Sequence, residues 1–258
     1  MILAIDMGNT NIVIGCIDDE KIYFTERLST DKSKTDLEYA MAFKTVMELY
    51  NIDTDKIEGA IISSVVPPIV NSLVRAVEKI IGKTPYVVGP GLKTGLNIKM
   101  DNPKTVGSDL IVDAVAGIKE YGAPLIIIDM GTATTMSVVD KDSNYIGGII
   151  APGVRLSMEA LSSNAAQLYK VSLEQPEKAI GKNTIDCMKS GLVLGEACMM
   201  DGLIERMEEE LGYKATIIAT GGLAKVVVPL CKREIIVDDD LLLKGLKIIY
   251  DKNGGKYA

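Results

Sequence analysis

One segment of the chain occurs twice, and this repeat limits what the chain can fold into. Residues 1–11, MILAIDMGNTN, match residues 125–135, LIIIDMGTATT, in kind: apolar residues, then Asp-Met-Gly, then a polar loop. The two aspartates, Asp6 and Asp129, lie about half of the 258-residue chain apart. Each copy predicts a buried strand that ends in a tight loop. The repeat therefore favours two related lobes, which we place at residues 1–118 and 119–258.

The residues after each loop predict a second strand followed by a polar turn in both lobes. The apolar pattern resumes over 12–17 and 136–139, and polar turn residues follow at 18–20 and 140–144. This order is typical of a hairpin. Each lobe is therefore expected to open with a strand, a loop of phosphate size and a returning strand.

Helices are predicted in much of the remainder of each lobe. Their signs are a capping box, Thr35-x-x-Glu38, and apolar residues at helical spacing. The expected elements are a helix from Thr35, a helix from about Pro68 to Gly82, one long helix from Thr184 to Leu211, a strand over 215–219, and a last helix that starts at the acidic run 238–240. Within the long helix, Gly191 and Gly195 are expected to let a neighbouring element approach closely. The sequence thus predicts an α/β chain with mixed sheets flanked by helices.

Charge and composition argue against several classes of partner. The chain has 28 basic and 35 acidic residues, a net charge of −7, and no lysine and arginine cluster that would offset nucleic-acid phosphates. No apolar run approaches the ~18 residues of a membrane span, and Asp6 interrupts the apolar stretch that a signal peptide needs. We therefore expect a cytoplasmic protein that binds neither nucleic acid nor a membrane.

The chain has no histidine, which restricts both metal sites and catalysis. Its four cysteines form no Cys-x-x-Cys pair, so a zinc site is not expected. We predict instead that the cysteines are small buried apolar residues. A general base would have to be a carboxylate, a lysine, a thiolate or a tyrosine.

The two Asp-Met-Gly loops have the composition of phosphate-binding turns. A glycine between a strand-end aspartate and polar residues lets backbone N–H groups approach a phosphate, while the carboxylate faces the phosphate-bound cation. Either loop alone is equally consistent with a plain turn between strands. The occurrence of two matched copies favours the phosphate interpretation.

A candidate catalytic carboxylate stands near the middle of the chain. Gly107-Ser108-Asp109 precedes an apolar helical pattern, so Ser108 is a plausible N-cap and Asp109 falls in the first turn. There the helix dipole favours the ionised carboxylate by roughly 0.3–1 kcal/mol. Such a group could deprotonate an attacking hydroxyl, an effect of about 10²–10⁴ in rate. The alternative is an acidic residue that only favours the helix start.

Three other segments are candidate contacts, and two of them allow two interpretations. Residues 147–153, GGIIAPG, either line a pocket with backbone or form a bent strand that leads into a helix. Residues 220–222, Thr-Gly-Gly, follow a predicted strand and open a helix, where a nucleotide's base or ribose can rest. Thr184 is most simply an N-cap, and a role of its hydroxyl towards substrate is the minor alternative.

Together these motifs resemble the type III pantothenate kinases, a branch of the superfamily that also contains acetate and sugar kinases, heat-shock chaperones and actin. The likeness covers nearly the whole chain in order, and the ordered set is far more specific than any one motif. The motifs are Asp6-x-Gly8-Asn9-Thr10, Ser63-Ser64-Val65-Val66-Pro67, Asp101-Asn102-Pro103, Gly107-x-Asp109, Asp129-x-Gly131-Thr132-Ala133-Thr134, Gly147-Gly148 to Gly153, Asn183-Thr184 and Thr220-Gly221-Gly222. The resemblance implies an actin-like (ribonuclease H-like) duplicated fold.

The resemblance also implies an activity and a set of site residues. Members phosphorylate pantothenate with ATP and Mg²⁺, the first step of coenzyme A synthesis, require a monovalent cation (K⁺ or NH₄⁺), and form homodimers. By position, Asp109 resembles the proton acceptor and Asp129 the potassium ligand. The implied ATP contacts are Asp6, Met7, Gly8, Asn9, Thr10, Asn11, Ile12, Val13 and Thr132, and the implied pantothenate contacts are Met100, Gly107, Ser108, Asp109, Leu110 and Thr184.

Two positions depart from the family pattern. The family usually has Tyr before its Asp/Glu-Asn-Pro segment and Arg after the catalytic Asp, where this chain has Met100 and Leu110. Charge-assisted hydrogen bonds contribute about 1.5–3 kcal/mol, so affinity for a carboxylate substrate could fall by roughly ten- to a hundredfold unless Arg155 or Lys104 compensates.

Three functions follow as hypotheses. The chain is a working pantothenate kinase, a non-catalytic or altered-substrate homologue with a regulatory role, or an actin-like filament subunit. Met100 and Leu110 alone support the second, and no feature of the sequence supports the third.

Overall fold

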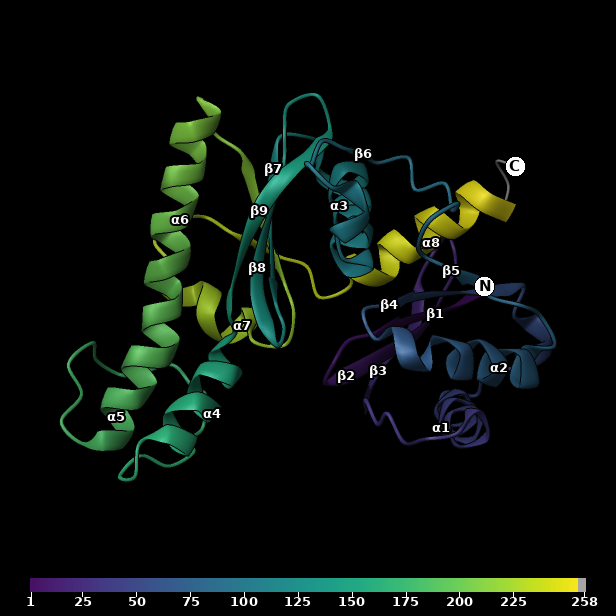
Figure 1. Ribbon diagram of the computed structural model, residues 1–258, viewed down its shortest axis with the longest axis horizontal. Helices are drawn as coiled ribbons and strands as arrows, with labels where there is room; N and C mark the ends of the chain where they lie inside the picture. The colour runs from purple at the N-terminus through teal and green to yellow at the C-terminus, as the bar shows by residue number, and fades with distance from the viewer. Residues whose placement is uncertain (255–258) are drawn as a thin grey trace. The chain divides into compact units, whose positions relative to one another are not determined.

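Two sheets with the same strand order organise the chain, as seen in a computed structural model that describes residues 1–254 (Figure 1). Each sheet belongs to one compact unit. The first unit contains residues 1–96, 102–116 and those from Asp240 onward, and the second contains residues 97–101 and 117–239. The division into functional lobes at residue 118 stays a prediction.

The sheet of the first unit has the order β3-β2-β1-β4-β5. The pairs β1–β2 and β2–β3 are antiparallel, whereas β1–β4 and β4–β5 are parallel. The strands are β1 (Ile2–Met7), β2 (Asn11–Ile17), β3 (Ile22–Ser29), β4 (Gly59–Ser64) and β5 (Tyr86–Val87). The predicted strand, loop and returning strand are confirmed here.

The sheet of the second unit repeats this arrangement and adds one strand. Its order is β11-β10-β7-β8-β9-β6, so β9-β8-β7-β10-β11 reproduces the first sheet with the same strand directions, and β6 is added beside β9. The strands are β6 (Asn97–Ile98), β7 (Leu125–Met130), β8 (Ala133–Val139), β9 (Asn144–Pro152), β10 (Thr216–Thr220) and β11 (Ile236–Val237). The duplicated α/β fold with mixed sheets is therefore confirmed.

Helices cover both faces of the first sheet because alternate residues of β1 point to opposite sides. Leu3, Ile5 and Met7 pack in one core with residues of α1 (Asp36–Leu49) and α2 (Val70–Ile81). Ile2 and Ala4 pack in a second core with residues of α3 (Ser108–Tyr121) and α8 (Leu241–Gly254). The predicted capping box of Thr35 and the helix end at Gly82 are both confirmed.

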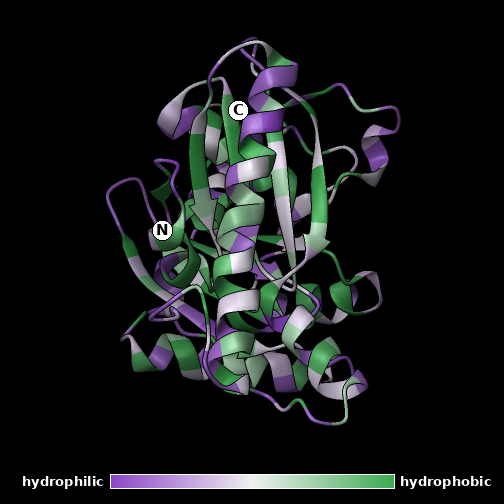
Figure 2. Ribbon diagram, turned by 90° about the vertical axis from the view of Figure 1, so that its left-hand side faces the viewer, coloured by the Kyte–Doolittle hydropathy of each residue, from purple (hydrophilic) through white to green (hydrophobic). Residues whose placement is uncertain are grey.

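One face of the second sheet is covered by helices from later in the chain. Ile126, Ile128 and Met130 pack against α4 (Val154–Asn164), α6 (Gly195–Leu211) and α7 (Ala224–Val227). Figure 2 shows α6 with polar and apolar residues along its length in front of mainly hydrophobic strands. Short 3-10 helices complete the chain: η1 (Thr54–Lys56), η2 (Pro67–Ile69), η3 (Pro103–Thr105) and η5 (Val228–Leu230).

The predicted long helix over 184–211 is confirmed, with one irregular turn. It comprises α5 (Thr184–Lys189), a π-helical turn (Ser190–Leu194) and α6. The role assigned to Gly191 and Gly195 is wrong, because a Cβ at either position would meet no atom within 4 Å. The two glycines lie at the π-helical turn and at its junction with α6 rather than under a neighbouring element.

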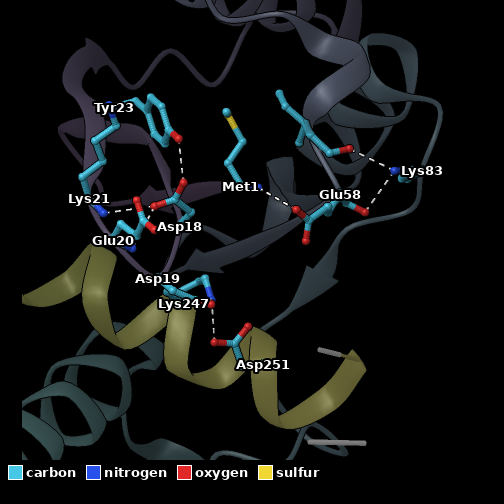
Figure 3. Close-up of polar contacts among 11 residues, drawn as sticks. Met1, Asp18, Asp19, Glu20, Lys21, Tyr23, Glu58, Lys83, Lys247 and Asp251 are labelled. Atoms are coloured by element: carbon cyan, nitrogen blue, oxygen red, sulfur yellow. Dashed lines mark hydrogen bonds and ion pairs between the residues drawn. The ribbon is translucent and has the colours of Figure 1, made fainter. Parts of the chain in front are cut away.

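One ionic contact ties the C-terminal helix to the rest of the first unit, and a second lies within the helix. The Lys247 ammonium on α8 pairs with Asp19 in the β2–β3 turn and with Asp251, each at 2.6 Å (Figure 3). Burial alone would lower the pKa of Lys247, but the hydrogen bonds to these two carboxylates raise it. The last helix is thus held at the end of the sheet where β2 turns into β3.

The four cysteines differ in burial. All four cysteines are free, and the prediction that they are buried is confirmed for Cys16, wrong for the exposed Cys187 and Cys198, and only partly met by the half-buried Cys231. Spacing alone carries no information on the face of a helix that a thiol occupies. Within residues 1–254, every helix is too short or too polar to cross a membrane.

Candidate active site

The first Asp-Met-Gly loop lies at the end of β1, with its polar residues open to solvent. Asp6 is the penultimate residue of the strand and is only 8% exposed, whereas Asn9, Thr10 and Asn11 are exposed. The Gly8 N–H donates to the Asn11 carbonyl (2.9 Å) and closes the turn into β2. Met7 and Ile12, two of the implied ATP contacts, are buried in the core, so they can offer only backbone atoms to a ligand.

The start of α3 is fixed to the same edge of the first sheet. The Ser108 hydroxyl donates to the Ser64 carbonyl (3.1 Å), accepts from the Ser64 N–H (3.1 Å), and lies 3.0 Å from the Ser63 hydroxyl. Ser63 is paired with Asp6 across β4 and β1, and directly paired residues point to one face. Asp6, Ser63 and Ser108 therefore lie together, with Asp109 next in the chain.

Ser108 does not have the predicted role of N-cap. Helix α3 begins at Ser108 itself, and the first turn closes by the bond from the Ile111 N–H to the Gly107 carbonyl (3.2 Å). The serine hydroxyl is used for the contact with β4, which sequence spacing cannot reveal. The prediction that Asp109 falls in the first helical turn is confirmed.

Asp109 is a partly buried carboxylate at a helix start. Burial raises its pKa, against the effect of hydrogen bonds from backbone N–H groups that stabilise the anion. One of these bonds comes from the Leu110 N–H to Oδ1 (2.9 Å). A carboxylate with a raised pKa is a better proton acceptor than an ordinary aspartate once ionised.

The second loop repeats this construction in the second unit, with one residue fewer. Asp129 is again the penultimate residue of its strand, and β8 begins at Ala133. The Gly131 N–H donates to the Ala133 carbonyl (3.0 Å), and the Gly153 N–H donates to the Thr132 carbonyl (3.1 Å). Thr132 is exposed at the tip. The shorter connection makes this loop tighter than the first.

The Thr-Gly-Gly segment approaches Asp129 closely. Thr220 is paired with Asp129 across β10 and β7. Gly221 has a φ of +95°, and a Cβ there would lie 2.7 Å from the Asp129 Oδ1. Only glycine fits this position without a shift of backbone. The helix expected after this segment is α7, a single turn of four residues.

The other predicted acceptor contacts lie in separate places. Met100 belongs to the second unit, where its sulfur would lie 3.7 Å from a Cβ on Gly147. Gly147 and Gly148 are part of β9, which leads into α4, as one interpretation of this segment predicted, and they also line a pocket beside α6, as the other predicted. Thr184 is the exposed first residue of α5, and the predicted N-cap role belongs instead to Asn183, which accepts from the Asp186 N–H (2.9 Å).

The comparisons with known proteins agree on one family. The sequence model of the type III pantothenate kinases matches residues 2–206. A type III pantothenate kinase of Bacillus cytotoxicus is 46% identical over 253 residues, covering 98% of this chain and 97% of that protein. One of an Exiguobacterium species is 47% identical over 253 residues, covering 98% and 99%. The chain belongs to the type III pantothenate kinase family.

Solved structures place this family member in the expected fold class. A putative Baf family transcriptional activator from Campylobacter jejuni aligns with a TM-score of 0.59 at 18% identity, covering 97% of this chain and 98% of that one. The activator of 2-hydroxyisocaproyl-CoA dehydratase from Clostridium difficile aligns with a TM-score of 0.57 at 12% identity, covering 96% and 93%. At these identities the likeness concerns the fold, which is actin-like as predicted.

The structure also adds one polar group that the motifs of the pantothenate kinases did not single out, the carboxylate of Glu196. Thr134, which follows the second loop, donates its hydroxyl to Glu196 of α6, and both side chains are buried. Burial raises the pKa of Glu196, against the effect of this hydrogen bond. The partners are far apart in sequence, and no local pattern marks the pair.

Proposed function

We propose that this chain transfers the γ-phosphoryl group of ATP to pantothenate and so forms 4′-phosphopantothenate, the first step of coenzyme A biosynthesis. The observation that carries the proposal is the placement of Asp109. Its helix start is bonded through Ser108 to the strand beside Asp6, so a candidate base and a candidate phosphate loop share one edge of one sheet. Family membership supplies the substrate.

Asp109 is proposed to accept the proton of the attacking hydroxyl of pantothenate. Its helix position and the bond from the Leu110 N–H to Oδ1 orient the carboxylate. Gly107, Ser108 and Leu110 would line the acceptor beside it. The acceptor contacts that the family implies for Met100 and Thr184 stay predictions. General base catalysis of this kind typically increases the reaction rate by about 10²–10⁴.

The two loops are proposed as phosphate sites. In the first unit, the ATP contacts implied for Asp6 and residues 7–13 would centre on the loop, where backbone N–H groups and the exposed side chains of Asn9 and Asn11 are suited to bind phosphate oxygens. In the second unit, Thr132 would do so from the tip of the tighter loop. Their shared construction supports the assignment.

The donor groups fit the cations that the family implies. Mg²⁺ is commonly held by one or two carboxylates together with substrate phosphates, and Asp6 offers such a carboxylate. Asp129 is proposed to bind K⁺ or NH₄⁺, and no group of three or more acidic or cysteine side chains among the described residues forms a metal cage of its own. The cations would neutralise phosphate charge, while the protein residues orient the reactants.

A homodimer in the cytoplasm is the proposed physical state. Several large apolar side chains of the second unit are exposed and would be covered in a dimer: Ile150, Leu156, Leu161, Tyr169, Ile180 and Ile185. The four free thiols suit a reducing compartment, where ATP is also available.

An altered-substrate or regulatory homologue is the second candidate, because Leu110 cannot pair with a substrate carboxylate. Arg155 and Lys104 are both exposed, on α4 and η3 respectively, and remain candidates to replace the missing cation.

ADP release separates the two candidates. The purified protein with Mg-ATP and K⁺ should release ADP only when pantothenate is added, and replacing K⁺ by Na⁺ should slow it. A panel of other hydroxy acids serves as the comparison. Turnover on one of these acids but not on pantothenate would favour the altered substrate, and nucleotide binding without turnover on any acceptor would favour the regulatory role.

A further inference from the structure

Thr30, the residue after β3, bonds to two of the three carbonyl groups of the first loop. The Thr30 hydroxyl donates to the Gly8 carbonyl (2.7 Å), and the Thr30 N–H donates to the Thr10 carbonyl (2.9 Å). The residue after Thr30 is in turn held by α1, because the hydroxyl of the buried Tyr39 donates to the Asp31 carbonyl (2.6 Å) and accepts from the Asp31 N–H (3.3 Å). The loop is thus connected to the helix through Thr30.

These two bonds set the direction of the loop's amides. In a planar trans peptide the C=O and the following N–H point in opposite directions. The Gly8 carbonyl shares its peptide with the Asn9 N–H, and the Thr10 carbonyl shares its peptide with the Asn11 N–H. Thr30 donates hydrogen bonds to both of these carbonyl groups. The N–H groups of Asn9 and Asn11 therefore point away from Thr30, which is the direction that a phosphate-binding turn requires.

The internal repeat offers a comparison within the same chain. In the register of the second sheet, Gly153 takes the place of Thr30, and its N–H donates to the Thr132 carbonyl as that of Thr30 does to Thr10. A Cβ on Gly153 would lie 2.5 Å from the Thr132 oxygen and 2.6 Å from the Gly131 oxygen. The tighter second loop leaves no space for the side chain that holds the first.

We propose that Thr30 is a positioning residue for nucleotide binding: its hydroxyl and N–H orient the amides of Asn9 and Asn11 towards the phosphates without touching the nucleotide. The proposal rests on the proposed role of Gly8–Asn11 as a phosphate site. It predicts that removal of the hydroxyl weakens nucleotide binding and leaves acceptor binding unchanged.

The test compares Thr30→Val, which keeps the shape but loses the hydroxyl, with Thr30→Ser, which keeps the hydroxyl. Thr25→Val is the control, because Thr25 is exposed on the same strand. Binding of Mg²⁺ and a non-hydrolysable ATP analogue is measured by calorimetry, with KM for ATP and for pantothenate. Loss of one neutral hydrogen bond should weaken nucleotide binding by about three- to tenfold in Thr30→Val only, with KM for pantothenate within about twofold.

Each outcome decides the proposal. Equal nucleotide affinity in Thr30→Val and the parent overturns it, as does an equal loss in Thr30→Ser, because the hydroxyl would then not be the cause. If Thr30→Val fails to fold, Thr30→Ala is measured instead, and failure of both to fold assigns the bonds to stability and overturns the proposal. A parent protein that binds no nucleotide refutes the proposed function itself, a result distinct from all of these.

Discussion

Replacing Asp109 by Asn should lower turnover and raise stability, and the two effects together test the proposed role of Asp109 as the base. The amide keeps the shape of the side chain, and its oxygen can still accept the bond from the Leu110 N–H, 2.9 Å long in the parent. Only the capacity to accept a proton is lost. Turnover should therefore fall by about 10²–10⁴, which corresponds to roughly 2.7–5.4 kcal/mol in the activation barrier.

Stability should move in the other direction. Burial raises the pKa of Asp109 in the folded protein above its ordinary value of 3.8. A carboxyl with a raised folded-state pKa destabilises the fold at pH values above its unfolded pKa, and this cost disappears as the pH falls below that value. Asp109→Asn should therefore raise the melting temperature at pH 7, and the difference from the parent should vanish near pH 3.8 and below.

The assay combines ADP release with thermal unfolding at several pH values. Glu120→Gln serves as the matched control, because it removes one charge from an exposed residue at the other end of α3. Binding of an ATP analogue should stay within about twofold of the parent in both variants. Near-parental turnover of Asp109→Asn would refute the assignment of the base, and a loss of both turnover and stability would assign Asp109 to the fold instead.

Three further outcomes are expected. Leu110→Arg should lower the KM for pantothenate by roughly ten- to a hundredfold, and an unchanged KM would favour a different acceptor. A double-mutant cycle with Met100→Tyr should give a coupling energy above about 0.5 kcal/mol if both side chains contact one acceptor. Gly221→Ala should destabilise the protein by about 1–3 kcal/mol and weaken activation by K⁺, because its Cβ would lie 2.7 Å from the Asp129 Oδ1; parental stability in urea would contradict that contact. Lys247→Met should lower the free energy of unfolding by about 1 kcal/mol with kinetic constants unchanged, and no shift in the urea midpoint would show that its two ion pairs contribute nothing.

The features that the sequence predicted correctly depend on neighbouring residues. A strand, a glycine turn and a returning strand are encoded within about fifteen residues, so both copies of the repeat could be read directly. The capping box at Thr35 and the left-handed Gly82 also act within one turn of helix. Strand β6 escaped prediction because its two residues pair with β9 far along the chain, where no periodic pattern is long enough to be seen.

The candidate site also contains some residues that local sequence motifs predict and others that they do not. Asp6, Asp109 and Asp129 follow from motifs that are continuous in sequence. The role of Ser108 was mistaken because its hydroxyl bonds to Ser64 of a distant strand rather than to its own helix. Thr30 gave no signal at all, since a threonine at the end of a strand is common and its bond to Gly8 depends on the sheet register.

The placement of α8 has a consequence for the order in which the protein can be made. Its residues Leu243, Leu246 and Ile249 complete, with residues of α3, the core beneath Ile2 and Ala4 of the first strand, so that face of the first sheet stays partly exposed until α8 has left the ribosome. The second unit, drawn almost entirely from residues 117–239, emerges complete before then. The half of the chain that is synthesised first should therefore be the last to acquire its native stability, in contrast to the usual sequence of domain folding during translation. Nascent chains arrested with residue 239 outside the ribosome and α8 still in its exit tunnel should carry a protease-resistant second unit and a protease-sensitive first one.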